Sequence, residues 1–222
     1  RRGLALEPGI RSEVEELKKQ LSEASTDFRD NIRNWDEALH FAREELEGLD
    51  EDFLASVRTV EGDYAIRPNV THEVIQVYKH AAREDTRKRM LTARASRVPE
   101  NLEILESMVE LRARIAEMLG YESWADYRTE TRMAGSGDRA SEFLHDLVTR
   151  LESKYRAELA SLAELKREHT GDPDTGIHAW DVTYYEEMRD RNLYELDSNE
   201  VKQYFPYEKC IEGMFEIYEE VF

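Results

Sequence analysis

Cysteine is almost absent from this chain of 222 residues, which holds only Cys210. A single cysteine excludes an internal disulfide and any zinc site built from clustered cysteines, and it fits a reducing compartment. The chain also lacks an apolar run of the length that spans a bilayer, so we expect no membrane partner. No signal peptide is visible, and the chain starts at Arg1 without a methionine. We therefore expect either a processed start or a segment cut from a longer protein.

Positive charge is the second scarcity. The chain has 31 Lys and Arg residues against 49 Asp and Glu residues, which gives a net charge of −18. A surface that follows nucleic-acid phosphates needs the opposite balance, and the same repulsion disfavours docking to anionic lipid. We therefore expect no nucleic acid among the partners. A hydrophobic content of 40% with 36% charged residues is typical of a globular protein whose long helices have solvated outer faces.

The familiar catalytic motifs are missing as well. The sequence has no P-loop, no GxGxxG and no GxSxG elbow. The nearest approach to the zinc motif HExxH starts at His72, but its fifth position is Gln76, and His80 lies too far along the same helix to share a metal with His72. The residues alone therefore predict no self-sufficient active site and no metal held by this chain.

Apolar residues at steps of three and four are abundant, and this spacing indicates helices. The first stripe follows Pro8, which suits the first turn of a helix. We predict an all-α, mostly helical fold with at most one or two short strands, at 38–42 and 64–70. Pro68 confines the second strand to an edge or to its own end. The first stripe consists of Val14, Leu17, Leu21, Ala24, Phe28, Ile32 and Trp35.

Short polar residues before the stripes predict where helices begin, because their side chains can accept from free backbone N–H groups. Gly120 predicts the end of one helix, and the composition at 169–171 predicts the end of a longer one. The predicted N-caps are Asp50, Thr71, Ser123 and Asp138, and Asp197 with Glu200 resembles a capping box.

Three later stripes predict the inward faces of helices that start near Pro99, after Gly137 and at Pro206. The last stripe reaches Phe222, so we expect further chain to cover this apolar face. The three stripes are Leu102, Leu105, Met108, Leu111 or Arg112, Ile115 and Leu119; Leu144, Leu147, Leu151, Tyr155, Leu159, Leu162 and Leu165; and Ile211, Met214, Phe215, Tyr218 and Phe222.

A basic helix at 84–96 is the one positive patch in this acidic chain. The favoured interpretation is that its arginines pair with carboxylates of neighbouring helices. The functional interpretation is a local contact with an anion or with a peptide carboxylate. The basic residues are Arg83, Arg87, Lys88, Arg89, Arg94 and Arg97.

Aromatic residues cluster in the stretch 176–206. Trp180 and Tyr184 share one helical stripe, and Tyr185 lies on the neighbouring one. Such stripes usually pack in a core. The alternative is that a tyrosine hydroxyl faces a cleft and contacts a ligand, which makes Tyr184 and Tyr185 the candidate site residues.

The triplet Gly135-Ser136-Gly137 predicts a hinge or a subdomain boundary, because small residues give the backbone freedom. We predict one helical segment at 1–134 and a second at 135–222.

Several stretches resemble one family in unbroken order. The run from Leu119 to Tyr127, and the Trp-Asp and Tyr-Tyr pairs at 180–185 joined to Tyr204-Phe205-Pro206, are specific in combination. With these motifs the chain is similar to the thimet oligopeptidase, neurolysin and saccharolysin family, the zinc-dependent M3 oligopeptidases. The stretches are RRGLAL, LKKQLSEASTDFRDNI, ELEGLDEDFLASV, NLEILESMVELRARIAEMLGYESWADYRTETRMA, GIHAWDVTYYEEM and NEVKQYFPYEKCIEGMFEIYEEVF.

The resemblance implies two largely helical halves that flank a deep channel, where a zinc on an HExxH helix activates water against short peptides. It places 1–134 in one channel lobe and 135–222 in the opposite lobe. This sequence has no HExxH, whose helix should follow Phe222, so no catalytic or metal residue carries over. The resemblance implies zinc in the full-length parent and none bound by this segment. Tyr184 and Tyr185 stay candidates for contact with the substrate channel.

From the resemblance we expect a non-catalytic central scaffold segment of a metalloendopeptidase that hydrolyses short peptides. The alternative is a standalone, M3-like peptide-binding or regulatory module. The parent is expected to be an enzyme and the 222 residues alone to be inactive. The expected partners are short peptides for the parent, and the remainder of the same polypeptide on the apolar face near Phe222. The expected compartment is cytoplasmic, with a mitochondrial one as the alternative.

Overall fold

The computed structural model describes residues 6–194, 201 and 204–221. Helices dominate them, and two short strands, β1 (Leu39–Phe41) and β2 (Tyr64–Ile66), pair antiparallel with His40 opposite Ala65. The prediction of an all-α fold with at most two short strands is confirmed. The helices are α1 (Pro8–Asn34), the 3₁₀ helix η1 (Arg43–Leu46), α2 (Glu51–Val57), α3 (Thr71–His80), α4 (Glu84–Ala95), α5 (Asn101–Met118), α6 (Trp124–Thr129), α7 (Gly137–Thr170), α8 (Val182–Tyr194) and α10 (Tyr207–Val221).

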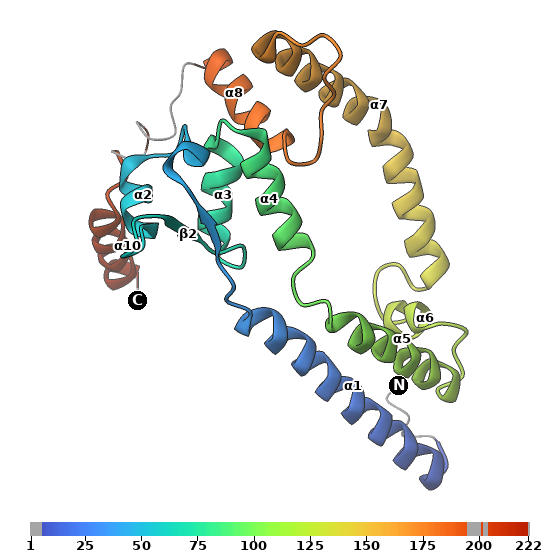
Figure 1. Ribbon diagram of the computed structural model, residues 1–222. Coiled ribbons are helices and arrows are strands. Elements are labelled where there is room, and N and C mark those ends of the chain that lie inside the picture. The colour runs from blue at the N-terminus through green and yellow to red at the C-terminus, as the bar shows by residue number, and fades with distance from the viewer. Residues whose placement is uncertain (1–5, 195–200, 202–203, 222) are drawn as a thin grey trace.

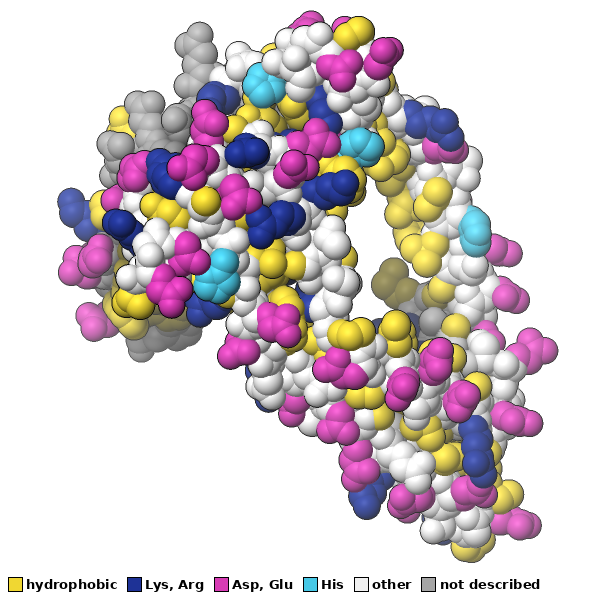
Figure 2. Space-filling view, in the orientation of Figure 1, with side chains coloured by type: hydrophobic (Ala, Val, Ile, Leu, Met, Phe, Trp, Pro, Cys, Tyr) yellow, Lys and Arg dark blue, Asp and Glu magenta, His cyan; other side chains and the backbone are white. Residues whose placement is uncertain are grey.

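The described helices form an open frame rather than a closed bundle (Figure 1). α1 and α5 lie side by side at the bottom of the view, and α3 and α4 stand at the left. α7 runs along the right from α6 to the level of α8, and α8 closes the top. Figure 2 shows that an opening remains between α7 and the α4–α5 side when side chains are drawn, with hydrophobic side chains along its edges.

One hydrophobic core surrounds the two strands. Side chains from β1 and β2 pack against those of η1, α2, α3 and α4, and Phe41 of β1 and Ile66 of β2 are buried. This burial of apolar surface stabilises the left side of the frame. Its buried members are Phe41, Leu46, Leu49, Leu54, Ile66, Val74, Val77, Ala81 and Met90.

A second, smaller core joins α1 to α5. Val14 and Leu17 of α1 are buried against Ile115 of α5, with Trp124 of α6 half-buried beside them. The first predicted stripe is thus confirmed at its start. Its later members, such as Phe28, are only half-buried, although Asn101 at the start of α5 donates to the carbonyl oxygen of Phe28 at 2.9 Å.

Two predicted inward faces are wrong along part of their length. Leu102 of α5 is 65% exposed and Leu105 is exposed too, whereas Met108 and Ile115 are buried as predicted. The described elements cover the C-terminal half of α5 and leave the start of this face open.

The stripe of α7 shows the same division. Only Leu162 is buried, and Leu159 and Leu165 are half-buried. The main packing partners of α7 are α6 at its start and α8 at its end, so the turns between them have no cover among the described residues. The exposed members are Leu144, Leu147, Leu151 and Tyr155.

Two of the predicted N-caps are confirmed. Asp50 Oδ1 accepts from the N–H of Asp52 at 2.8 Å, and Ser123 Oγ accepts from the N–H of Asp126 at 3.1 Å. Gly120, with φ of +80°, follows the end of α5, where this left-handed conformation favours glycine.

Two other predicted caps are wrong by one or two positions. Thr71 is the first residue of α3 and Val70 occupies the cap position, without a side-chain hydrogen bond. Ser136, rather than Asp138, caps α7 by accepting from the N–H of Arg139 at 3.2 Å. The proposed capping box at Asp197 lies outside the described residues.

The Gly-Ser-Gly triplet forms a tight junction between α6 and α7. The N–H of Gly137 donates to Asp126 Oδ1 at 2.8 Å, and a Cβ at position 137 would lie 3.0 Å from that of Ala125. Glycine therefore permits the close approach of the two helices here. The boundary between 1–134 and 135–222 stays a prediction.

Candidate functional site

The aromatic stretch lies where three parts of the chain meet. After α7 ends, the chain returns through a turn at His178–Asp181 and enters α8, which packs against α3 and the end of α7. Figure 1 shows α8 at the top of the frame, between α7 and the α3–α4 pair. The side chains that join these parts are charged as well as aromatic.

Asp181 is the centre of a buried ionic cluster. Its side chain has no exposed surface. Arg87 Nη2 of α4 donates to Asp181 Oδ1 at 2.7 Å, and Lys166 Nζ of α7 donates to Asp181 Oδ2 at 2.7 Å. The N–H of His178 also donates to Oδ2, at 3.1 Å. One carboxylate therefore binds α4, α7 and the turn before α8 to one another.

The remaining charges of the cluster have partners too. Lys166 Nζ also donates to Glu84 Oε2 at 3.0 Å, and Trp180 Nε1 donates to Glu84 Oε1 at 2.9 Å. Arg87 makes further hydrogen bonds to the carbonyl oxygens of Ala81, Ala82 and Trp180. Buried charges are tolerated when paired and hydrogen-bonded in this way, and removing one partner is costly.

The cluster holds its carboxylates in the ionised form. Burial alone raises the pKa of Asp181, but the hydrogen bonds from Lys166 and Arg87 outweigh burial, so the pKa lies below its ordinary value. Burial also raises the pKa of Glu84, but the hydrogen bonds from Trp180 and Lys166 outweigh burial, so this pKa also lies below its ordinary value. Both groups are therefore anionic at neutral pH.

The two candidate tyrosines occupy this junction. Tyr185 is buried, its hydroxyl lies 3.2 Å from His169 Nδ1, and burial raises its pKa to about 12. Tyr184 is half-buried, with its ring edge-on to Tyr185 and the Arg87 guanidinium 4.2 Å from its centroid. Contact of Tyr184 or Tyr185 with a peptide stays a prediction.

The basic helix divides into paired and unpaired arginines. Arg87 pairs with Asp181, and Arg89 pairs with Glu45 at 2.5 Å, so the favoured interpretation of these two is confirmed. Arg94 and Arg97 have no carboxylate within 4.0 Å among the described residues.

Sequence reasoning missed the cluster as a unit, although it offered one signal. Lys166 follows Leu162 by four residues, which puts a lysine on a face predicted to be apolar. A lysine on a buried face needs a carboxylate partner. The partners Asp181 and Glu84 lie 15 and 82 residues away in sequence, and only the fold brings them together.

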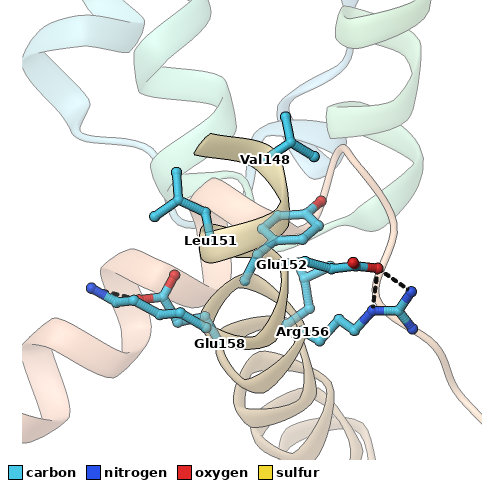
Figure 3. A pocket seen from close by; sticks show the side chains of 8 residues that line it. Val148, Leu151, Glu152, Arg156 and Glu158 are labelled. Atoms are coloured by element: carbon cyan, nitrogen blue, oxygen red, sulfur yellow. Dashed lines mark hydrogen bonds and ion pairs between the residues drawn. The ribbon is translucent and has the colours of Figure 1, made fainter. Parts of the chain in front are cut away.

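A hollow of about 790 Å³ lies along α7, and all the described residues that line it belong to this helix. Figure 3 shows Val148 and Leu151 on one side of the hollow and the ion pair of Glu152 with Arg156 on another. The second charged pair, Lys154 with Glu158, is also exposed. The hollow presents apolar surface and satisfied charges rather than reactive groups.

No group of three or more His, Cys, Asp or Glu side chains is placed to hold a metal ion in the described part of the chain. None of the described helices is both long and apolar enough to cross a membrane.

Comparison with known proteins gives consistent matches. The model of Peptidase family M3 matches residues 77–222. Saccharolysin of Saccharomyces cerevisiae is 32% identical over 99% of this chain and 32% of its own length. Oligopeptidase A of Escherichia coli is 25% identical over 99% of the chain and 34% of its own length. A mitochondrial intermediate peptidase of Arabidopsis thaliana is 31% identical over 67% of the chain and 21% of its own length. The chain thus spans about a third of the length of the first two relatives.

Proposed function

The chain belongs to peptidase family M3, and from this we propose that it is the central, non-catalytic scaffold segment of a zinc-dependent metallo-oligopeptidase that hydrolyses short peptides. The observation that carries the proposal is the alignment of 99% of the chain with about a third of saccharolysin and of oligopeptidase A. In this proposal the longer polypeptide supplies the chemistry, and the chain supplies part of the walls that confine the peptide.

Zinc belongs to the remainder of the proposed parent. The residues present here do not fit a zinc site, because the sequence has no HExxH and the described residues hold no cluster of metal ligands. The chain's own contribution is therefore structural: the Asp181 cluster fixes the angle between α7 and the α3–α4 pair.

Two exposed apolar faces support a larger assembly. α7 exposes Val148 and Leu151, and α10 exposes Phe215, Tyr218 and Val221. Exposed apolar surface of this extent marks interfaces in proteins. We propose that the remainder of the polypeptide covers both faces, including the one that leads to Phe222, with 1–134 and 135–222 in opposite lobes of the channel.

The partners follow from the same proposal. The parent binds short peptides, and Tyr184 and Tyr185 are the proposed contacts of this segment with the channel. We propose a cytoplasmic compartment. A mitochondrial one is the alternative, since one relative is a mitochondrial intermediate peptidase.

The test compares the chain with a longer polypeptide that contains it. We expect the purified 222 residues to leave a fluorescence-quenched peptide intact and to bind no stoichiometric zinc by elemental analysis. We expect the longer polypeptide to cleave the same peptide and to lose this activity to a chelator. Chelator-sensitive cleavage by the 222 residues alone would refute the assignment as a non-catalytic segment.

The alternative function is a standalone peptide-binding module. It is favoured by the hydrophobic edges of the opening in Figure 2, which can receive a ligand without the remainder of a protease. This function predicts saturable binding of short peptides by the 222 residues alone, and a flat titration would count against it.

A further inference from the structure

A second pocket, of about 510 Å³, lies where the end of α1, the end of α4 and the start of α5 meet. This pocket shares no residue with the Asp181 cluster, and its Arg97 follows Arg87 of that cluster by ten residues. We propose that this pocket, held by Arg94 and Arg97, binds the carboxylate of an apolar C-terminal residue of a short peptide.

The two arginines of the pocket keep their charges uncompensated. Arg94 Nη1 donates to the carbonyl oxygen of Pro68 at 2.6 Å, and Arg97 Nη1 donates to the carbonyl oxygen of Arg94 at 2.5 Å. Neither guanidinium has a carboxylate within 4.0 Å among the described residues, although the chain carries 49 acidic residues. Arg87 of the same helix, in contrast, is fully paired.

One donor of Arg97 is unsatisfied. Its Nε is buried and has no hydrogen-bond partner among the described residues. Burial, followed by the nearby charge of Arg94, lowers the pKa of Arg97. A bound oxygen anion would accept from the guanidinium N–H groups and relieve the repulsion between the two arginines, and carboxylates suit the planar fork of a guanidinium.

The backbone beside Arg97 is strained. Val98 has φ of +55°, which is rare for a β-branched residue, and it precedes Pro99, which restricts it further. Its side chain is buried, and its carbonyl oxygen accepts from the N–H of Asn101 at 3.0 Å. Strained backbone of this kind is found most often at ligand-binding and active sites.

The walls of the pocket select the kind of anion. Phe28 and Ile32 of α1 face the pocket together with Leu102 and Leu105 of α5, and the two leucines are exposed. An apolar side chain next to the carboxylate would bury this surface, whereas inorganic phosphate would leave it in water. The exposure of Leu102 and Leu105, which the helical stripe did not predict, is thus explained by their place in a binding pocket.

The experiment measures binding to the 222-residue chain by titration calorimetry at low ionic strength. The probes are N-acetyl-leucine and its amide, which differ only in the carboxylate. We expect a dissociation constant on the order of 1 mM for the acid and a roughly tenfold weaker one for the amide, since one lost charge-assisted pair is worth at least a factor of ten. Equal affinity of acid and amide, or no saturable binding of the acid, overturns the proposal.

Variants assign the binding to the pocket. R97Q should weaken the binding of N-acetyl-leucine about tenfold. R97K should weaken it by less, because lysine keeps the positive charge but loses the planar fork of the guanidinium. R150Q is the matched control, since Arg150 is an exposed arginine paired with Asp146 on α7, and it should change nothing. Unchanged affinity in R97Q overturns the proposal. If R97Q does not fold, judged by circular dichroism, R94Q carries the same test.

That the bound carboxylate belongs to a peptide rests on the proposed function. That the pocket binds a carboxylate at all does not. An inactive longer polypeptide would refute the proposed peptidase and leave the calorimetric result intact. Equal binding of N-acetyl-leucine and its amide would refute the proposed carboxylate site and leave the result of the peptidase assay unaffected.

Discussion

The same apolar stripe of α7 is buried near the C-terminus of the helix and exposed along its earlier turns. Toward its C-terminus Leu162 is 2% exposed and Lys166 is locked to Asp181 inside the junction with α8. Along its earlier turns Leu151 is 50% exposed and Tyr155 is 60% exposed, although they continue the same stripe. A helix can therefore carry one apolar face that is core at one end and surface at the other.

The contrast indicates which contacts hold the frame together. The end near α8 (the closed end) depends on a few buried, paired charges, whereas the turns that carry Leu151 and Tyr155 (the open end) have no cover among the described residues. Substitutions at the closed end should therefore cost stability, and equivalent substitutions at the open end should not.

The largest expected effect comes from the Asp181 carboxylate. D181A leaves Arg87 and Lys166 buried without their shared partner, and an uncompensated buried charge costs about 3–5 kcal/mol. We expect the free energy of unfolding in urea to fall by this amount. D146A is the control at the open end, where the exposed pair with Arg150 is worth about 0.2–1 kcal/mol. Equal losses in the two variants would erase the distinction between the ends.

The next effect compares two leucines of one stripe. L162A removes buried methyl groups and leaves a cavity, so we expect a loss of about 2–5 kcal/mol. L151A changes a half-exposed side chain and should stay within about 0.5 kcal/mol of the parent chain. Urea unfolding of both variants measures the contrast directly. A large loss in L151A would show that the open face is covered in solution, for instance by a second copy, and a dependence on protein concentration would identify that case.

Acid should weaken the closed end of α7. The pKa of Asp181 and that of Glu84 are lowered in the folded chain, so the unfolded chain binds protons first as the pH falls. The contribution of the cluster is then complete above the unfolded values near pH 4 and disappears as the pH falls further.

The measurement is the urea midpoint from pH 7 to pH 3, with E84Q as the variant. Glu84 is partly exposed, so this variant should fold, and it should lose less stability between pH 5 and pH 3 than the parent chain. An identical decline in both proteins would mean that carboxylates elsewhere govern the acid response.

Local features of the fold could be predicted from the sequence because local physics decides them. The short strands at 39–41 and 64–66, the caps at Asp50 and Ser123 and the stop at Gly120 depend on a few neighbouring residues. The predicted cap positions at Thr71 and Asp138 were wrong by one and two residues, because a nearby residue could also begin the helix.

Features that depend on contacts across the chain could not be predicted in the same way. An apolar stripe states that a face can be buried, but the neighbouring elements decide which turns are covered, as Leu151 and Leu162 show. The partner of Arg87 and Lys166 could not be predicted either, because Asp181 lies 94 residues from Arg87 in sequence. The one readable hint was a lysine within an apolar stripe.

The smallest expected effect tests the aromatic side of the closed end. Y185F keeps the buried ring beside Tyr184 and removes only the hydroxyl that lies 3.2 Å from His169 Nδ1. A net hydrogen bond is worth about 0.5–1.5 kcal/mol, so we expect urea unfolding to show a loss in this range. Y155F is the control on the open face of α7, where the side chain is 60% exposed and removal of its hydroxyl should be neutral. If Y185F changed the free energy of unfolding as little as Y155F, the Tyr185 hydroxyl would not contribute to stability. This result would favour the proposed contact of Tyr185 with peptide.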